Sequence, residues 1–330
     1  DKDIRFARPI HWVMAIFGGS VVEFQLNGIK SGNLSRGHRF MSPGQFLVKD
    51  FRSYQSQAEP NSLVIDPEAR RQRIVKQVEE LARSKGGMVL RDEGLVDEVM
   101  NLVEFPVAVM GSFSKDFLRV PKEVLITAMR EHQRYFSIVD NQGTLLPYFI
   151  TISNTRAEDM GVVQAGNERV LTARMSDAAY FFDHDMRAPL ADRVEGLKKV
   201  TYQEKLGSVY DKTERIRDLA VSLAGILKAD GAVAGRAATL SKADLLTGVV
   251  GEFPKLQGVM GRHYALTSGE DPKVADAIAE HYLPRFAGDA LPGSLEGVCV
   301  GIADRIDTIT GCFAVGLIPS GSEDPYGLRR

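Results

Sequence analysis

Cysteine is scarce in this sequence of 330 residues. Only Cys299 and Cys312 occur, thirteen positions apart within one apolar segment. Two thiols in such a segment indicate buried side chains in a reducing compartment, not a framework of disulfides. We therefore expect a cytoplasmic protein whose fold depends on its hydrophobic cores.

The motifs of the commonest nucleotide-binding and hydrolytic enzymes are missing. No two of the 31 glycines lie two positions apart, so the dinucleotide-binding pattern GxGxxG cannot occur. The patterns GxxxxGKS/T, HExxH, CxxC and GxSxG are also absent. These absences exclude the usual ATPase, zinc-protease and serine-hydrolase interpretations.

Long apolar runs and a dominant charge are missing as well. No apolar run reaches the length of about 18 residues that a membrane span needs, and the first residues lack the apolar core of a signal peptide and a starting methionine. Lysine and arginine number 41 against 43 aspartates and glutamates, a net charge of -2. We expect no membrane partner, no uniformly basic surface that coats DNA, and a fragment of a longer chain.

Strand and helix signals mix over the first 155 residues. Ile10–Phe17 and Ser20–Leu26 flank Gly18 and Gly19, which predicts a hairpin. Asp66 and Pro67 are typical of a helix start, and Gly86 of its end. A second hairpin is predicted around Asn141-Gln142-Gly143. This half is expected to be α+β.

After about residue 157 the strand signals stop, and the second half is expected to be all-α. The apolar residues recur with a helical period from Glu168 onward. Strands segregated from helices imply two domains, with the boundary near residues 187–205. Further helices are predicted at residues 212–228, 242–250, 254–263, 272–282 and 295–315.

Two clusters combine arginine, histidine and aromatic residues. SRGHRF contains Arg36, His38 and Arg39 beside Phe40, and AMREHQRYF contains Arg130, His132 and Arg134 beside Tyr135 and Phe136. Guanidinium groups can hold phosphates and aromatic rings can stack on unpaired bases, so each cluster is a candidate RNA contact. The alternative is an ordinary solvated sheet edge whose arginine stems cover apolar surface.

Two acidic and histidine-containing groups are candidate metal sites. Asp183, His184 and Asp185 are consecutive, but neighbouring helical residues point about 100° apart, which favours a polar cluster at a helix end. Asp244, His281 and Asp304 lie on three separate predicted helices and could converge on one metal. Their alternative is a helix-start carboxylate and surface ion pairs.

Several strings together carry a resemblance to a known family. RFARPIHW, SRGHRF, REHQRYF, ISNT, GNERVLTARMSDAAYFF, KADLLTGVVGEFPKLQGVMGRHYA and GIADRIDTI closely resemble the beta subunit of the bacterial two-subunit, heterotetrameric glycyl-tRNA synthetase. The matches run from Arg5 to Arg330. The resemblance implies that the chain lacks an N-terminal piece and a C-terminal anticodon-binding region.

The resemblance also implies a division of labour. In that family the alpha subunit carries the catalytic core that uses ATP with Mg, while the beta subunit chiefly holds tRNA. The expected partners are therefore tRNA(Gly) and the alpha subunit, with no cofactor bound by this chain. Residues 1–157 are expected to be similar to the editing-type module of phenylalanyl-tRNA synthetase beta subunits. Connecting helices follow at residues 158–200, and an HD-like helical domain at residues 201–330.

The HD-like half departs from the pattern of metal-dependent HD phosphohydrolases. The position of the His-Asp pair reads Ala243-Asp244, and LGSVYDKTERI contains no first histidine. Asp244, His281 and Asp304 are thus expected to be vestigial, without metal and without catalytic residues in this chain. Two alternatives stay open: an HD-type phosphohydrolase, and hydrolytic editing of mischarged tRNA in the α+β half.

A local excess of positive charge lies between the two halves. Residues 187–217 contain eight basic and five acidic residues, a net charge of +3. Neutralisation of phosphates dominates the affinity of proteins for nucleic acids. Lys198 and Lys199 are therefore expected to contact the tRNA backbone. A solvated helix face is the alternative.

Overall fold

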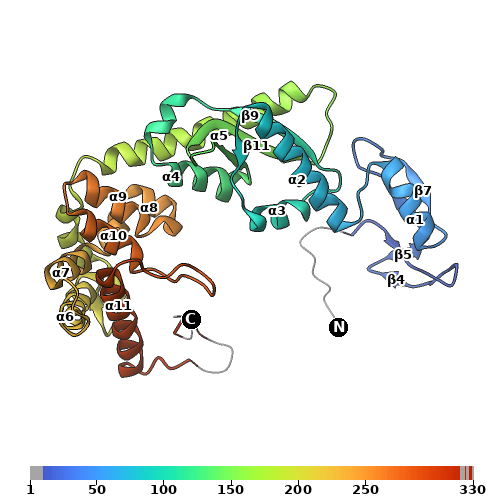
Figure 1. Cartoon of the computed structure of the whole chain (residues 1–330). Helices are drawn as coiled ribbons and strands as arrows, with labels where there is room; N and C mark the ends of the chain where they lie inside the picture. The colour runs from blue at the N-terminus through green and yellow to red at the C-terminus, as the bar shows by residue number, and fades with distance from the viewer. Residues whose placement is uncertain (1–9, 320–323, 325–326, 329–330) are drawn as a thin grey trace. The chain divides into compact units, whose positions relative to one another are not determined.

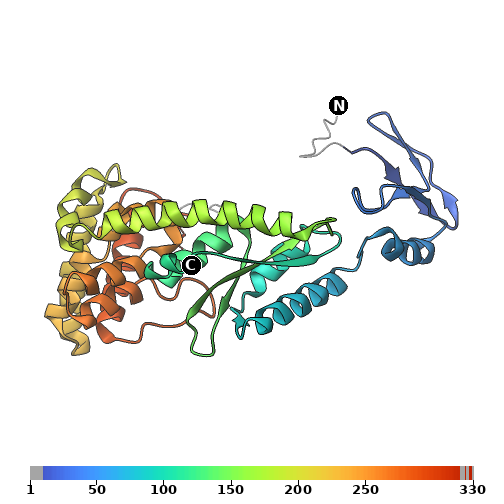
Figure 2. The same ribbon diagram turned by 90° about the horizontal axis from the view of Figure 1, so that it is seen from above.

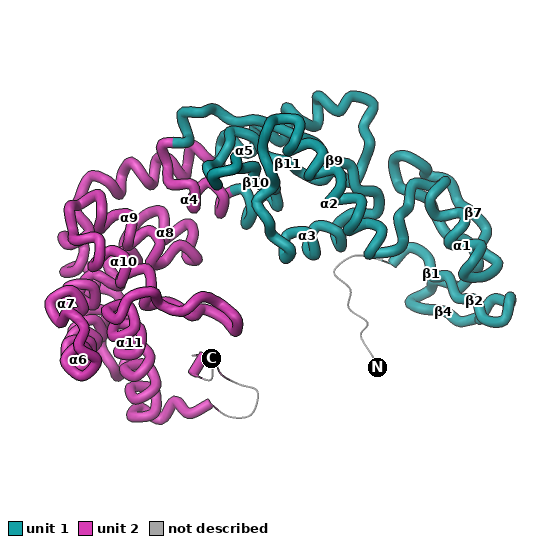
Figure 3. The backbone as a smooth tube through the Cα atoms, in the orientation of Figure 1, with its two compact units in different colours: residues 1–118, 129–174 teal, residues 119–128, 175–330 magenta. Residues whose placement is uncertain are grey.

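The computed structural model describes residues 10–319, 324, 327 and 328. It divides into two compact units: unit 1 comprises residues 1–118 and 129–174, and unit 2 comprises residues 119–128 and 175–330 (Figure 3). The chain mixes helices with small sheets, as predicted. The expected domains at residues 1–157, 158–200 and 201–330 stay predictions, and residues 5–9 of RFARPIHW lie outside the described residues.

Unit 1 begins with a small β module. The predicted first hairpin forms at its turn, where β2 (Ile16–Phe17) pairs antiparallel with β3 (Ser20–Val21). Gly18 and Gly19 both have positive φ angles, which this tight turn requires. The hairpin is shorter than predicted, because β1 (Val13–Met14) and β4 (Gln25–Leu26) instead pair with β5 (Ile29–Gly32).

A second ribbon completes this module. β6 (Leu34–Arg36) pairs antiparallel with β7 (Gln45–Leu47), and α1 (Phe51–Ala58) follows with the short helix η1 (Glu59–Asn61). Phe46, Val48, Ala58 and Leu63 form its buried core. The ribbon therefore presents the loop of residues 37–44 from a packed base.

The main sheet of unit 1 has the order β8-β10-β11-β9. The predicted second hairpin is confirmed, since its two strands pair antiparallel, and the predicted helix after Asp66 is confirmed as well. Asp66 caps that helix by accepting from Glu68 N at 3.0 Å. The bounds are β8 (Met88–Val89), β9 (Val107–Ser112), β10 (Phe136–Val139), β11 (Leu145–Ser153), α2 (Pro67–Ser84) and α3 (Glu93–Met100).

Helices cover both faces of this sheet. Ile150 of β11 packs with Ile74 of α2 and Leu95 of α3 in one buried cluster. Phe149, the next residue along the strand, points to the opposite face, as the period of two in a strand requires. There Glu168 Oε1 of α5 (Met160–Asp185) accepts from Ser112 N at 2.8 Å. Figure 2 shows the sheet between α2 and the first part of α5.

Unit 2 is largely helical (Figure 1). Small residues such as Ala220, Ala237, Ala277 and Ala303 are buried where its helices approach one another. The main helices are α6 (Val209–Leu227), α7 (Gly231–Leu240), α9 (Val259–Thr267), α10 (Pro272–Glu280) and α11 (Leu295–Ala314). Its shorter segments are α4 (Lys122–Thr127), η4 (Leu190–Lys199), η5 (Ala243–Leu246), α8 (Gly248–Glu252) and η6 (Pro254–Leu256). Two further short helices, η2 (Lys115–Arg119) and η3 (Ala128–Gln133), belong mostly to unit 1.

Four predictions about the helical half need correction. The predicted helix at 254–263 is η6 followed by α9, because Gly258 between them has a positive φ angle. α5 begins at Met160 and not near Glu168. The predicted helix at 242–250 is two short segments, because Thr247 has an extended backbone and caps α8. The expectation of no strands after residue 157 is wrong, since β12 (Thr201–Gln203) pairs with β13 (Gly207–Ser208). Among the described residues, no helix has both the length and the apolar character needed to cross a bilayer.

Candidate functional site

The loop after β6 holds the first predicted cluster. His38 is 1% exposed, and its Nδ1 accepts from the backbone N of Phe40 and of Met41, both at 3.3 Å. Gly37 must lack a side chain, because a Cβ there would lie 2.2 Å from Ser42 O. His38 therefore shapes the loop from inside, and direct contact of its ring with RNA is not available in this conformation.

Arg36, Arg39 and Phe40 lie on the outside of the same loop. The Arg36 guanidinium lies 5.4 Å from the Trp12 ring centroid, and that of Arg39 lies 5.6 Å from the Phe40 ring centroid. Phe40 is 71% exposed. Neither arginine forms an ion pair within the described part of the chain. Two uncompensated cations beside an exposed ring can contact both phosphates and unpaired bases.

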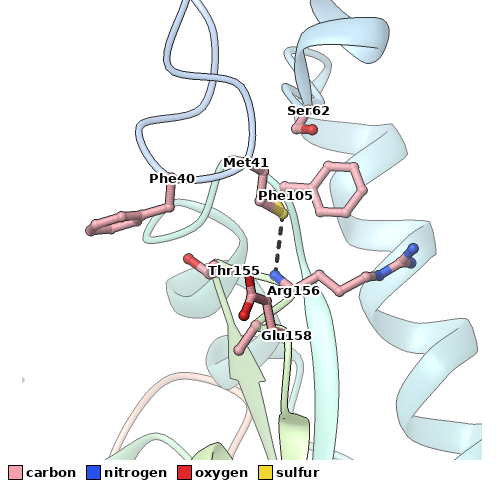
Figure 4. Close-up of a pocket in the computed structure, with 8 residues that line it drawn as sticks. Phe40, Met41, Ser62, Phe105, Thr155, Arg156 and Glu158 are labelled. Carbon is pink, nitrogen blue, oxygen red and sulfur yellow. Dashed lines mark hydrogen bonds between the residues drawn. The ribbon is translucent and has the colours of Figure 1, made fainter.

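A cavity of about 610 Å³ adjoins this loop within unit 1 (Figure 4). Arg156 donates its backbone N–H to Met41 Sδ at 3.2 Å across one side of the cavity. The Arg73 guanidinium lies 4.1 Å from the ring centroid of Phe105, which lines the cavity. The lining residues are Phe40, Met41, Ser62, Phe105, Thr155, Arg156, Ala157 and Glu158.

The second predicted cluster is largely neutralised by carboxylates. Arg130 donates to Asp92 at 2.7 Å and to Glu131 at 2.9 Å, and the bond to Asp92 raises its pKa. Arg134 pairs with Glu98. His132 lies half-buried in η3 between them. This arrangement fits the alternative of a sheet edge, so the role of Arg130, His132 and Arg134 in RNA binding stays a prediction.

Most of the lysine and arginine side chains at residues 187–217 make hydrogen bonds or ion pairs within unit 2. Lys198 Nζ lies 2.6 Å from Glu195 Oε2 and 4.6 Å from the Tyr210 ring centroid. Lys199 is exposed and makes no ion pair with a described residue. Arg193, Lys212, Arg215 and Arg217 are all engaged within unit 2.

The Asp183-His184-Asp185 triplet splits in the way that helix geometry predicts. Asp185 is buried and accepts from Gly248 N at 2.8 Å and Val249 N at 3.0 Å, the first residues of α8. Asp183 pairs with Arg119 at 2.5 Å, while His184 stacks on Tyr180. The three side chains therefore share no centre.

Asp244 is buried and caps a helix other than its own. Its Oδ2 accepts from Gly258 N at 2.7 Å and Gly261 N at 3.0 Å, at the start of α9. Burial raises the pKa of Asp244 to about 6, although the two N–H groups and Lys242 oppose that shift. Asp244 thus acts as a helix cap, one of the two alternatives for this residue.

His281 and Asp304 do converge, with an ammonium group between them. Lys242 Nζ lies 2.8 Å from His281 Nε2 and 2.7 Å from Asp304 Oδ2. His281 Nδ1 lies 2.6 Å from Ile278 O, which assigns the ring proton to Nδ1 and leaves Nε2 to accept from Lys242. Burial and the nearby Lys242 both lower the pKa of His281, which keeps the ring neutral.

A second lysine binds the other oxygen of Asp304. Lys212 Nζ lies 2.8 Å from Asp304 Oδ1 and 3.1 Å from Asp307 Oδ2. Burial opposes ionisation of Asp304, yet the charges of Lys242 and Lys212 hold its pKa far below the usual range. Asp304 is therefore a carboxylate with two ammonium partners.

This centre does not fit the metal of an HD enzyme. A divalent ion needs free lone pairs from several ligands. Here Nε2 of His281 and both oxygens of Asp304 already accept from lysines, and Asp244 faces α9. Within the described ranges, no three histidine, cysteine or acidic side chains are grouped to hold a metal.

Sequence reasoning missed both lysines. The signal was available for Lys212, which falls in the buried register of α6 with Val209, Thr213 and Ile216. A lysine on the apolar stripe of a helix requires a buried anion. Lys242 lies directly before the Ala243-Asp244 pair and offered no periodic signal of its own.

Comparisons with known proteins agree with the sequence resemblance. The family described as "Glycyl-tRNA synthetase beta subunit" matches residues 1–330. The chain is 58% identical to the "Glycine--tRNA ligase beta subunit" of Geobacter sulfurreducens, and 57% identical to the proteins of that name from Geotalea daltonii and Trichlorobacter lovleyi. Each match covers the whole chain and 48% of the relative, so the chain spans about half the length of these curated relatives.

The family match and the curated relatives place this mixed α/β chain in the class of aminoacyl-tRNA synthetase subunits. Within that class, the chain belongs to the glycyl-tRNA synthetase beta subunit family.

Proposed function

We propose that this chain is the part of the glycine-tRNA ligase beta subunit that binds and positions tRNA(Gly). It holds the tRNA so that the 3′ end reaches the active site of the alpha subunit, where ATP with Mg is used. This role supplies orientation and leaves the reacting groups to the alpha subunit. The cytoplasm, where translation takes place, is the compartment in which we place it.

The observation that carries this proposal is the outer surface of the loop of residues 36–41. Arg36 and Arg39 have no carboxylate partner among the described residues, and the Phe40 ring is exposed. The guanidinium groups gain from contact with an anionic partner, and the exposed ring gains from stacking on a base. His38 supports the same surface by fixing the loop from below.

Lys198 and Lys199 form a second proposed contact with the tRNA backbone. Lys199 makes no ion pair in the described part of unit 2. Lys198 pairs with Glu195, whose side chain is exposed to solvent. Exposed pairs contribute little to stability, so a phosphate can replace Glu195 at low cost. Arg130, His132 and Arg134 rank below these residues, because carboxylates already neutralise the two arginines.

No observation favours the hydrolytic alternatives. Phosphohydrolase chemistry of the HD type would require a metal where the Lys242 ammonium lies. We keep the HD-like interpretation of residues 201–330 as a proposal about fold, and the editing-like interpretation of residues 1–157 likewise.

The test is tRNA(Gly) binding to the full chain across a series of salt concentrations. Each lost phosphate contact is expected to weaken binding and to reduce the slope of log affinity against log salt by about 1. The variants Arg36→Ala/Arg39→Ala and Lys198→Ala/Lys199→Ala should both show this. Arg262→Ala is the matched control, since Arg262 is exposed and pairs with Asp276. Variants with the slope of the unaltered chain would contradict the proposal.

A further inference from the structure

A second cavity lies in unit 2, beside the buried lysine centre. Its volume is about 380 Å³, and its wall includes His281, Tyr282, Arg285, Asp304, Arg305 and Thr308. These residues come from the end of α10, the segment that follows it, and α11. His281 and Asp304 belong both to this wall and to the group that binds Lys242.

The carboxylate on this wall adds no free negative charge. Lys242 binds one oxygen of Asp304 at 2.7 Å, and Lys212 binds the other at 2.8 Å. Thr308 Oγ1 accepts from Lys212 at 2.7 Å and donates to Asp304 O at 2.8 Å. The acidic side of the cavity is therefore already neutralised.

The two arginines on the wall lack carboxylate side-chain partners. Arg305 donates to main-chain oxygens, among them His281 O and Leu283 O, both at 3.0 Å. Arg285 makes two long bonds, to Lys255 O at 3.4 Å and Gln257 O at 3.2 Å. Carbonyl groups satisfy N–H donors without cancelling the charge of a guanidinium, and Arg285 keeps donors free for a ligand.

The charges around the cavity balance as a group, and the wall itself carries two guanidinium groups. Asp289 accepts from the backbone N of Arg285 at 2.8 Å, and Asp211 lies near Arg215. Five cations stand against five carboxylates: Lys212, Arg215, Lys242, Arg285 and Arg305 against Asp211, Asp244, Asp289, Asp304 and Asp307. The carboxylates lie on the lysines and Arg215 or bind backbone N–H groups, so the guanidinium groups of Arg285 and Arg305 are left to interact with an anion in the cavity.

We propose that this cavity binds a phosphate group, with Arg285 as its principal side-chain donor. A guanidinium offers two parallel N–H groups that match two phosphate oxygens, and Arg305 adds positive charge behind it. A metal cation would meet the guanidinium groups of Arg285 and Arg305 and is disfavoured.

The phosphate has two possible sources with the same chemistry: a small phosphate or nucleoside monophosphate, and the backbone of an RNA. The proposal does not rest on the tRNA-positioning role, whose residues in the loop of 36–41 and at Lys198 and Lys199 do not line this cavity. Failure of one can therefore be distinguished from failure of the other.

The test is calorimetric titration of the full chain with inorganic phosphate and with AMP at constant ionic strength. The unaltered chain should bind at least one of them, and Arg285→Ala should weaken that binding about tenfold or more, as loss of a charge-assisted pair of hydrogen bonds implies. Arg285→Lys should retain part of the affinity. Arg262→Ala, an exposed arginine of the same unit, should leave it unchanged.

A competition arm separates the two sources. If tRNA displaces bound AMP from the unaltered chain, and does so less well from Arg285→Ala, the phosphate belongs to RNA; if AMP stays bound, it belongs to a small molecule. The proposal is overturned if neither phosphate nor AMP binds at concentrations on the order of 10 mM. Equal affinity of Arg285→Ala and the unaltered chain would overturn it as well, and circular dichroism confirms that the variants are folded.

Discussion

At the centre of unit 2, three side chains from three segments share one buried hydrogen-bond network. Lys242 Nζ bridges His281 Nε2 and Asp304 Oδ2, and both His281 and Lys242 are buried. The ammonium supplies the positive charge that Asp304 needs in this site. Removing one member of such a buried group leaves the charges and hydrogen-bonding groups of the other members without a partner.

Lys242→Met is therefore expected to destabilise the protein by about 3 kcal/mol, because His281 Nε2 loses its donor and Asp304 one of its two ammonium partners. Urea unfolding followed by circular dichroism measures this. Lys199→Met, at an exposed lysine, should change the free energy of unfolding by less than about 0.5 kcal/mol. A loss below about 1 kcal/mol for Lys242→Met would show that the ammonium is not essential to the centre.

Asp244 gives a prediction about pH. Its pKa of about 6 lies above the ordinary value of 3.8, because burial penalises the charged form. The unfolded chain therefore ionises Asp244 at lower pH than the folded chain does. The contribution of Asp244 to stability falls as the pH rises from about 4 to 6, by roughly 3 kcal/mol, and is constant above that range.

Asp244→Asn keeps an oxygen that can accept from Gly258 N and Gly261 N but cannot ionise. The variant should match the unaltered chain near pH 4 and become relatively more stable toward pH 7. Urea unfolding at both pH values measures the difference in the free energy of unfolding. A difference that is independent of pH would contradict the raised pKa.

At the scale of single elements, the start of α8 depends on a residue from another helix. Asp185, at the end of α5, accepts from Gly248 N and Val249 N and from the Tyr264 hydroxyl at 2.9 Å. A buried carboxylate at a helix start satisfies N–H groups that have no partner within the helix. The position of α8 is thus tied to α5.

Asp185→Ala is expected to cost about 2–3 kcal/mol of stability, since it leaves buried donors without an acceptor. Asp183 is the matched control two residues away, because its ion pair with Arg119 is half exposed. Asp183→Ala should cost less than about 1 kcal/mol in the same thermal or urea unfolding experiment. Equal losses for the two variants would refute the capping role of Asp185.

Elements with strong local signals were predictable from the sequence. The hairpin around Asn141 to Gly143 and the helix after Asp66 carry turn and capping residues at the right places, and both form. Strands β12 and β13 escaped prediction because they are three and two residues long, too short for an alternating pattern. The partners of Asp185 and Lys242 lie dozens of residues away in sequence, so only the packed fold brings them together.

The sequence predicted which residues form the candidate site, but not which of their side chains are exposed or paired. The arginines and the ring of SRGHRF lie exposed on a loop, where the sequence suggested an RNA contact, but the burial of His38 follows from its bonds to the loop's backbone. In the second cluster, Asp92 and Glu98 come from α3 and its N-cap, and their approach to Arg130 and Arg134 depends on tertiary structure.

At the scale of the whole molecule, the proposal separates binding from chemistry. The loop of residues 36–41 offers cations and a ring to a ligand, and the helical unit holds Asp304 between two lysines. A subunit of this kind should affect how much tRNA is bound and how it is oriented, and not the activation of the amino acid.

The most direct test is steady-state aminoacylation by the full-length beta subunit assembled with the alpha subunit, comparing Arg36→Ala/Arg39→Ala with the unaltered enzyme. We predict that kcat/KM for tRNA(Gly) falls about tenfold while ATP–pyrophosphate exchange stays unchanged, because the tRNA loses contacts that bind and orient it and the activation of glycine does not use them. An unchanged kcat/KM, or loss of ATP–pyrophosphate exchange, would contradict the positioning role.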